Sequence, residues 1–223
     1  MKQTLKQLVA RFRAAAVDLA EPYLFDQEFV VDVLNEAQHE AAIRARLLHE
    51  CDAPEVCAIT LTAGKASYRL HESLYEITHL YRVEDGQPDT VLQLKSVEWL
   101  TNNYPDWRTD HKYMLPFAVQ EDATIRLATP PKAAGQLRLE GYRLPLHTMC
   151  GDNHSPEISI AHHEKLVQWA LFRAYSQPDS DGFDPQRASK AEAEFTAYFG
   201  PRPDADLRRQ TREDTDHANV TYI

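Results

Sequence analysis

Cysteines and histidines are the residues of this sequence that could form a metal site or a nucleophile. Cys51, Cys57 and Cys150 are an odd number with no close pair, so the sequence indicates neither a disulfide framework nor a zinc knuckle. The ten histidines are scattered, and the adjacent His162 and His163 would point about 100° apart on a helix. The i and i+4 spacing of helical metal ligands is missing. We therefore expect buried or idle thiols and no metal site.

Motifs that would build a catalytic site or hold a cofactor are absent from the sequence. It contains no phosphate-binding glycine loop, no G-x-S-x-G, no H-E-x-x-H and no C-x-x-C, and only seven glycines in all. Glu192 and Glu194 are a carboxylate pair on a predicted helix surface, where solvation explains them. Because an enzyme needs a convergent set of groups, the sequence predicts a protein with no catalytic residues and no cofactor. A small soluble metal-dependent hydrolase that uses some of the histidines is the alternative from another class, and metal analysis separates the two.

The charge of the chain limits its partners. It has 34 acidic and 24 basic residues and a formal net charge of -10, which argues against a protein that grips nucleic acid through its phosphates. An acidic surface would let a DNA duplex pass without binding, although solubility alone is the more ordinary explanation. No apolar run reaches the length of about 18 residues typical of a membrane helix, so we expect no membrane segment and synthesis in the cytoplasm.

Two helical regions lie at the ends of the sequence, at about residues 4–50 and 157–200. They are the framework that must position any functional surface of this protein. Apolar residues at three- and four-residue steps, from Leu5 to Phe12, predict a first helix. A second helix begins after Asp26 as N-cap, with Phe25 packed on Val30, and carries a stripe of small residues. Its opposite face is polar, and solvation is favoured over a neighbouring subunit for this face, which comprises Asn35, Gln38, His39, Arg44 and Arg46.

The second helical region predicts two further helices. One runs from Ser159 to about Tyr175, and the other begins with Asp184 as N-cap. We expect Gly200 to end the last helix in a left-handed conformation.

The middle of the chain alternates like β-strands. We expect strands at residues 56–62, 66–70, 75–83, 90–94, 113–119, 124–128 and 136–142, with a turn at Asp85 and Gly86. Ser96 is the predicted cap of a short helix anchored by Trp99 and Leu100, and Trp107 is a second anchor. This pattern predicts a small antiparallel sheet or sandwich.

The predicted fold is therefore α+β: an antiparallel four-helix platform built from both chain ends, an inserted small antiparallel β domain and an extended C-terminal arm. The expected boundaries are 1–52 and 151–200 for the two halves of the platform, 53–150 for the insert and 201–223 for the arm. The arm is polar and lacks periodicity, but its end, from Val220 to Ile223, is apolar and β-prone. It could add a strand to a partner or fill a groove on it, or it could be an idle terminus.

The order of these segments resembles the head-to-tail adaptor (connector, head-completion) proteins of tailed bacteriophages, especially the larger forms of short-tailed phages. The resemblance covers about residues 4–200 and rests on the segments 25–26, 34–38, 59–70, 98–100, 105–108, 142–146, 156–158, 166–175, 177–179 and 184–200. It implies a structural virion protein without catalytic residues, made in the host cytoplasm and located at the head-to-tail interface.

The resemblance also implies the partners. Copies of the chain would form a ring, usually of twelve, between the portal protein and the tail hub or nozzle protein, and double-stranded DNA would leave through its channel without specific binding. The arm is the expected portal-binding element, through Arg208, Arg209, Arg212, Val220, Tyr222 and Ile223. A tail-proximal collar or terminator protein shares this assembly logic and is the nearest alternative.

Overall fold

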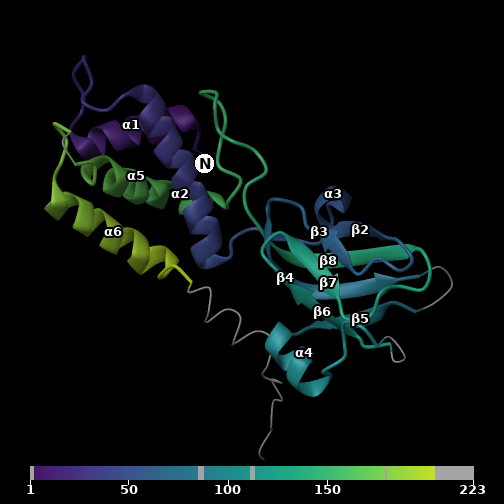
Figure 1. Ribbon diagram of the computed structural model, residues 1–223. Coiled ribbons are helices and arrows are strands. Elements are labelled where there is room, and N and C mark those ends of the chain that lie inside the picture. The colour runs from purple at the N-terminus through teal and green to yellow at the C-terminus, as the bar shows by residue number, and fades with distance from the viewer. Residues whose placement is uncertain (1–2, 85–87, 111–113, 179, 204–223) are drawn as a thin grey trace, which may run out of the picture. The chain divides into compact units, whose positions relative to one another are not determined.

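The computed structural model describes residues 3–84, 88–110, 114–178 and 180–203, and its chain divides into two compact units. The helical unit comprises Met1–Leu48 and Leu144–Arg202, and the β unit comprises His49–Arg143 (Figure 1). The α+β class predicted from the sequence is confirmed.

The helical unit consists of four α-helices and one 3-10 helix in the described part of the chain: α1 (Leu5–Ala16), α2 (Gln27–Ala45), η1 (Ile160–Lys165), α5 (Leu166–Tyr175) and α6 (Pro185–Phe199). The start of α1 is fixed by a capping box, in which the Thr4 hydroxyl accepts from the Gln7 N–H and the Gln7 side chain accepts from the Thr4 N–H. The carboxylate of Asp184 caps α6 by accepting from the N–H groups of Gln186 and Arg187 at 3.1 and 3.0 Å, as predicted.

Apolar stripes of these helices meet around α5, which contacts α1, α2 and α6. Leu8 and Phe12 of α1 are fully buried, and the ring of Phe25 packs edge-on against Phe12 and Tyr175. The small residues Ala37 and Ala41 of α2 lie in a cluster with aromatic residues of α5 and α6. The stripes predicted for both ends of the chain therefore form the core of this unit.

The prediction that the polar residues of α2 face solvent is wrong for three of them. Asn35 bonds both backbone groups of Met149, donating to its carbonyl at 2.9 Å and accepting from its N–H at 2.8 Å. Gln38 is buried and accepts from the N–H of Glu157 at 2.6 Å. Arg44 donates to Glu40 and to Thr196, both at distances under 3 Å. Asn35 and Gln38 bind backbone that returns from the β unit, and Arg44 also donates to the carbonyl of Gly200 at the end of α6, because these backbone groups lie outside any strand or helix.

His39 and Arg46 complete the polar face of α2. His39 is half-buried, and burial lowers its pKa against the opposing effect of Glu157, whereas Arg46 is exposed, as predicted.

Two helix boundaries also differ from expectation. The segment predicted to open a long helix at Ser159 is the 3-10 helix η1, and α-helical geometry begins only at Leu166. Gly200 ends α6 with a positive φ of 88°, but its ψ of 169° is extended and not that of a left-handed helix. The chain therefore leaves α6 in an extended direction, which only glycine adopts readily.

The β unit holds one sheet of eight described strands and two short helices. In chain order the elements are β1 (His49–Glu50), α3 (Pro54–Cys57), β2 (Ala58–Leu61), β3 (Ser67–Arg69), β4 (Leu74–Val83), β5 (Thr90–Leu94), α4 (Val97–Asn103), β6 (Phe117–Gln120), β7 (Thr124–Leu127) and β8 (Gly135–Arg143). The strand order is β1-β8-β4-β5-β6-β7-β3, and β2 also pairs with β8.

The expectation of an antiparallel sheet is wrong at one pair, because β5 and β6 are parallel and the sheet is mixed. The connection from β5 to β6 runs through α4, and such a crossover lets the two strands point the same way. Helix α4 itself is as predicted: the Ser96 hydroxyl accepts from the Trp99 N–H at 3.0 Å, and Leu100 and Trp107 are buried. Trp99 is half-buried and packs its ring edge-on against Phe117.

The long strand β4 does not alternate as predicted. Its register on β8 shifts between Leu74 and Glu76 and again between Ile77 and His79. These irregularities place Ile77 and Leu80 inward on the same side, although they are three residues apart. On β8, the fully buried Leu139 lies opposite Leu80, and the fully buried Leu137 lies opposite Arg82.

The strand predicted over residues 56–62 begins later, because Pro54 starts α3 at its first helical position and only Ala58–Leu61 is extended. The predicted turn at Asp85 and Gly86, and the start of the strand predicted over 113–119, lie outside the described residues. Within the described ranges, no helix has both the length and the apolar character needed to cross a membrane.

Candidate functional site

One of the three cysteines lies beside a histidine: the sulfur of Cys150 is 3.7 Å from the Nδ1 of His154. All three are free, and Cys51 and Cys150 are exposed whereas Cys57 is buried. Burial, together with nearby carboxylates, raises the pKa of Cys57 to about 11. This thiol is therefore protonated at neutral pH and is a poor nucleophile.

The two adjacent histidines diverge, as the sequence predicted. His162 bonds the hydroxyl of Tyr198 at 3.1 Å, while the ring of the buried His163 lies 3.0 Å from the carbonyl oxygen of Ile158. Glu192 and Glu194 are exposed on α6. Among the residues that the structure describes, no three His, Cys, Asp or Glu side chains gather in a way that could hold a metal ion.

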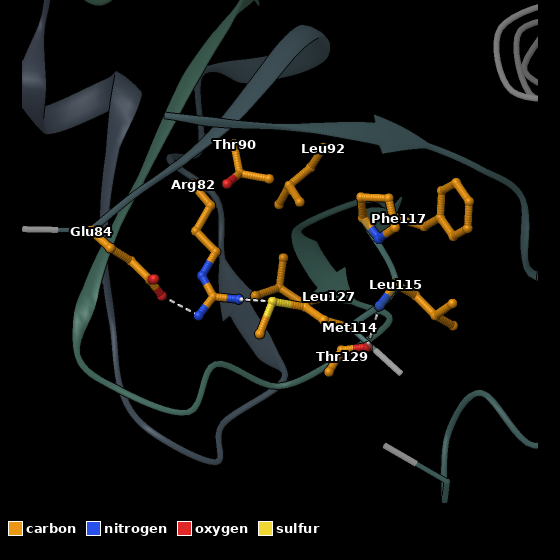
Figure 2. Close-up of a pocket in the computed structure, with 10 residues that line it drawn as sticks. Arg82, Glu84, Thr90, Leu92, Met114, Leu115, Phe117, Leu127 and Thr129 are labelled. Atoms are coloured by element: carbon orange, nitrogen blue, oxygen red, sulfur yellow. Dashed lines mark hydrogen bonds and ion pairs between the residues drawn. The ribbon is translucent and has the colours of Figure 1, made fainter. Parts of the chain in front are cut away.

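The β unit contains a cavity of about 150 Å³ between β4, β5 and the segment that enters β6 (Figure 2). Its walls are mainly apolar, and its lining includes Leu92, Leu115, Phe117 and Leu127. Arg82 is its buried charged group: the guanidinium pairs with Glu84, and one of its nitrogens lies 3.6 Å from the sulfur of Met114. The Nε of Arg82 has no hydrogen-bond partner in the described part of the chain.

The cavity combines a small apolar space with one ion pair, that of the buried Arg82 with Glu84. A hydroxyl in the lining, that of Thr129, accepts from the Leu115 N–H at 3.0 Å and so serves the fold. The lining residues come from distant parts of the sequence, and the sequence alone did not indicate them.

The second candidate surface is the apolar loop, which we define as residues 17–24 between α1 and α2. It exposes four large hydrophobic side chains: Val17 is 72% exposed, Leu19 is 69% exposed, Leu24 is 50% exposed and Tyr23 is 41% exposed. Apolar residues that gather on a surface mark interaction sites more often than scattered ones do. The sequence alone did not indicate this surface.

A buried ion pair holds the apolar loop in one conformation. Asp18 pairs with Arg13 and also accepts from the N–H groups of Leu24 and Phe25 at 2.8 and 3.2 Å. Arg13 further donates to the carbonyl of Phe25 at 2.8 Å and stacks on the ring of Tyr23. Burial alone would raise the pKa of Asp18, but the hydrogen bonds from Leu24, Phe25 and Arg13 outweigh it and lower that pKa. The loop therefore presents its apolar side chains from a preorganised frame.

The residues that the sequence assigned to portal binding cannot be placed on either surface. Arg208, Arg209, Arg212, Val220, Tyr222 and Ile223 lie outside the described residues.

Comparison with protein families matches residues 3–220 to the SU10 adaptor protein family, so the chain belongs to that family. The family to which the chain belongs defines its class, that of a structural adaptor protein. The resemblance to phage head-to-tail adaptors is thereby confirmed, and the chain is a phage structural adaptor of the virion. No match is found among curated proteins.

Proposed function

We propose that copies of this chain form a ring between the portal and the tail, which completes the head and leaves a channel for genome ejection. The observation that carries this proposal is the family match, which spans both compact units. Identical subunits that contact each other head to tail close into a ring when the rotation permits. Twelve copies is the number that the resemblance to connector proteins favours.

The parts of the chain have different roles in this proposal. The platform, residues 1–52 and 151–200, makes the contacts between copies, and the insert, residues 53–150, contacts the tail hub or nozzle protein. The Arg82 cavity lies within the insert and offers that tail protein an anchor point. The net charge of -10 supports passage of DNA through the channel without specific binding.

The arm, residues 201–223, binds the portal. Ordering it costs about 1 to 2 kcal/mol per residue in backbone entropy, so it binds only where the partner offers a large surface. Its arginines supply charge-assisted bonds, and its apolar end supplies burial. The residues that we assign to this contact are Arg208, Arg209, Arg212, Val220, Tyr222 and Ile223.

Deleting residues 204–223 tests the arm. We expect the truncated chain to bind purified portal rings at least about 100-fold more weakly than the full chain, a loss of about 2.7 kcal/mol. Biolayer interferometry with immobilised portal measures it. Two full-length variants separate the contribution of charge from that of burial. Replacing the three arginines by serine should remove the salt dependence of binding. Replacing Val220, Tyr222 and Ile223 by serine should keep that salt dependence unchanged. Unchanged affinity of the truncated chain would remove the arm from the portal contact.

A further inference from the structure

Both ends of the helical unit expose apolar side chains, but the charged residues beside them differ in sign. At one end, the apolar loop lies next to the start of α6, where Phe183 is 50% exposed and a Cβ on Gly182 would lie 3.5 Å from the Leu24 side chain. At the other end, Ile160 of η1 is 53% exposed and Tyr198 of α6 is 43% exposed. Because α6 has 15 residues, its two ends lie about 20 Å apart.

The end with the apolar loop is acidic. A hollow of about 270 Å³ lies beside Leu24, and Asp26 and Asp181 are among the residues that line it. Both are exposed, as is Glu21 within the loop. The sequence has no lysine or arginine from residue 14 to residue 43, and none of these three carboxylates has an ion pair in the described part of the chain. This end therefore combines apolar side chains with uncompensated negative charge.

The other end carries positive charge beside its apolar residues. The Lys165 ammonium lies 5.5 Å from the centre of the Tyr198 ring, and His162 bonds the hydroxyl of that tyrosine. Glu164 at this end is already paired with Arg11 at 2.8 Å. Lys165 is exposed and forms no ion pair within the described residues.

Val17 adds an independent sign that the apolar loop has a role beyond folding. Its φ of 61° and ψ of 32° are left-handed, a conformation in which glycine or asparagine normally ends a helix. A β-branched residue is strained there, and its side chain gains no burial in return. A residue whose backbone conformation is strained, and whose side chain gains no burial from it, is expected at a functional position.

We propose that the apolar loop of one copy docks on the surface formed by Ile160, Tyr198 and Lys165 of the next copy. The two surfaces are complementary in charge and both have an apolar centre, and they lie at opposite ends of one unit, which is what a head-to-tail contact requires. Two apolar loops facing each other would bring like charges together, which disfavours a two-fold contact. This inference rests on the proposed function, since it names the lateral contact of the proposed ring.

Removing the apolar side chains tests the contact. Sedimentation velocity follows self-association of the full chain over rising concentration, first alone and then with purified portal rings. We expect Val17→Gly and Leu19→Ser each to weaken association at least tenfold. Val17→Gly should also raise the melting temperature, so its loss of association cannot come from misfolding. Val91→Thr, which changes a comparably exposed valine in the β unit, should leave association unchanged.

Charge exchange tests the pairing itself. Glu21→Lys and Lys165→Glu should each weaken association, and the double variant should restore it by at least fivefold relative to either single variant. Association of wild-type strength in all four single variants would overturn the proposal, as would a wild-type chain that stays monomeric in both conditions.

The two proposals fail in different ways. Assembly on the portal that is unchanged in these variants would contradict the lateral contact and leave the adaptor function supported. Self-association that depends on these residues, without any binding to the portal, would support the lateral contact and contradict the adaptor function.

Discussion

Replacing Asp18 by asparagine is expected to lower the free energy of unfolding by about 3 kcal/mol. The carboxylate is buried, pairs with Arg13 and accepts the backbone N–H groups of Leu24, at the end of the apolar loop, and of Phe25, just after it. Asparagine keeps the size but removes the charge, so the buried guanidinium of Arg13 loses its counter-ion. Thermal unfolding should show a melting temperature lower by about 6–12 °C.

Asp26→Asn is the matched control, because this acid lies near the same loop but makes no side-chain capping bond. It should change stability by less than about 0.5 kcal/mol. A loss below about 1 kcal/mol for Asp18→Asn would mean that the ion pair does not hold the loop.

The same ion pair predicts a pH dependence. The pKa of Asp18 is lower in the folded protein than in the unfolded chain. Its stabilising contribution is therefore complete above the unfolded pKa, about 4, and is lost as the pH falls through the folded pKa. The gap in stability between wild type and Asp18→Asn should close over that acidic range, while it stays constant near neutral pH.

Replacing Gly141 by alanine is expected to destabilise the β unit by about 3 kcal/mol. A Cβ at this position of β8 would overlap the carbonyl oxygen of Glu76 and lie 3.1 Å from the Cα of Ile77. Both neighbours are backbone of β4 at its irregular register, so neither can rotate away as a side chain would. Relief requires a shift of β4 against β8, which exposes or misplaces Ile77 and Leu80.

Urea unfolding measures this effect, and hydrogen exchange of the β4 amides locates it. Gly151→Ala is the control, since a Cβ there meets only the His154 ring at an ordinary distance of 3.4 Å. Unfolding of both alanine variants at the same urea concentration would show that β4 does not crowd Gly141.

The sequence predicted those parts of the fold that depend on local chemistry. Helix starts at Ser96 and Asp184 follow from hydroxyl or carboxylate caps, and the cores follow from apolar periodicity. The predictions from the sequence were wrong where burial or strand register depends on backbone that is distant in the chain. Asn35 and Gln38 look like surface residues until the chain returns beside α2, and the bulges of β4 arise only from pairing with β8.

Both candidate surfaces were missed for related reasons. The Arg82 cavity is assembled from four separate segments, which no local pattern reveals. The apolar loop did carry a signal, because Val17, Leu19 and Leu24 are apolar residues outside any helical stripe. Their exposure cannot be read from the sequence, because it depends on the loop conformation in which Arg13 and Asp18 are buried and these side chains are not.

Cryo-electron microscopy of the phage particle that carries this chain tests the central claim most directly. We expect a closed ring of copies between portal and tail, with the apolar loop of each copy against Tyr198 of the next. Particles in which this chain is missing from the head-to-tail junction, or sits there as separate monomers, would contradict it.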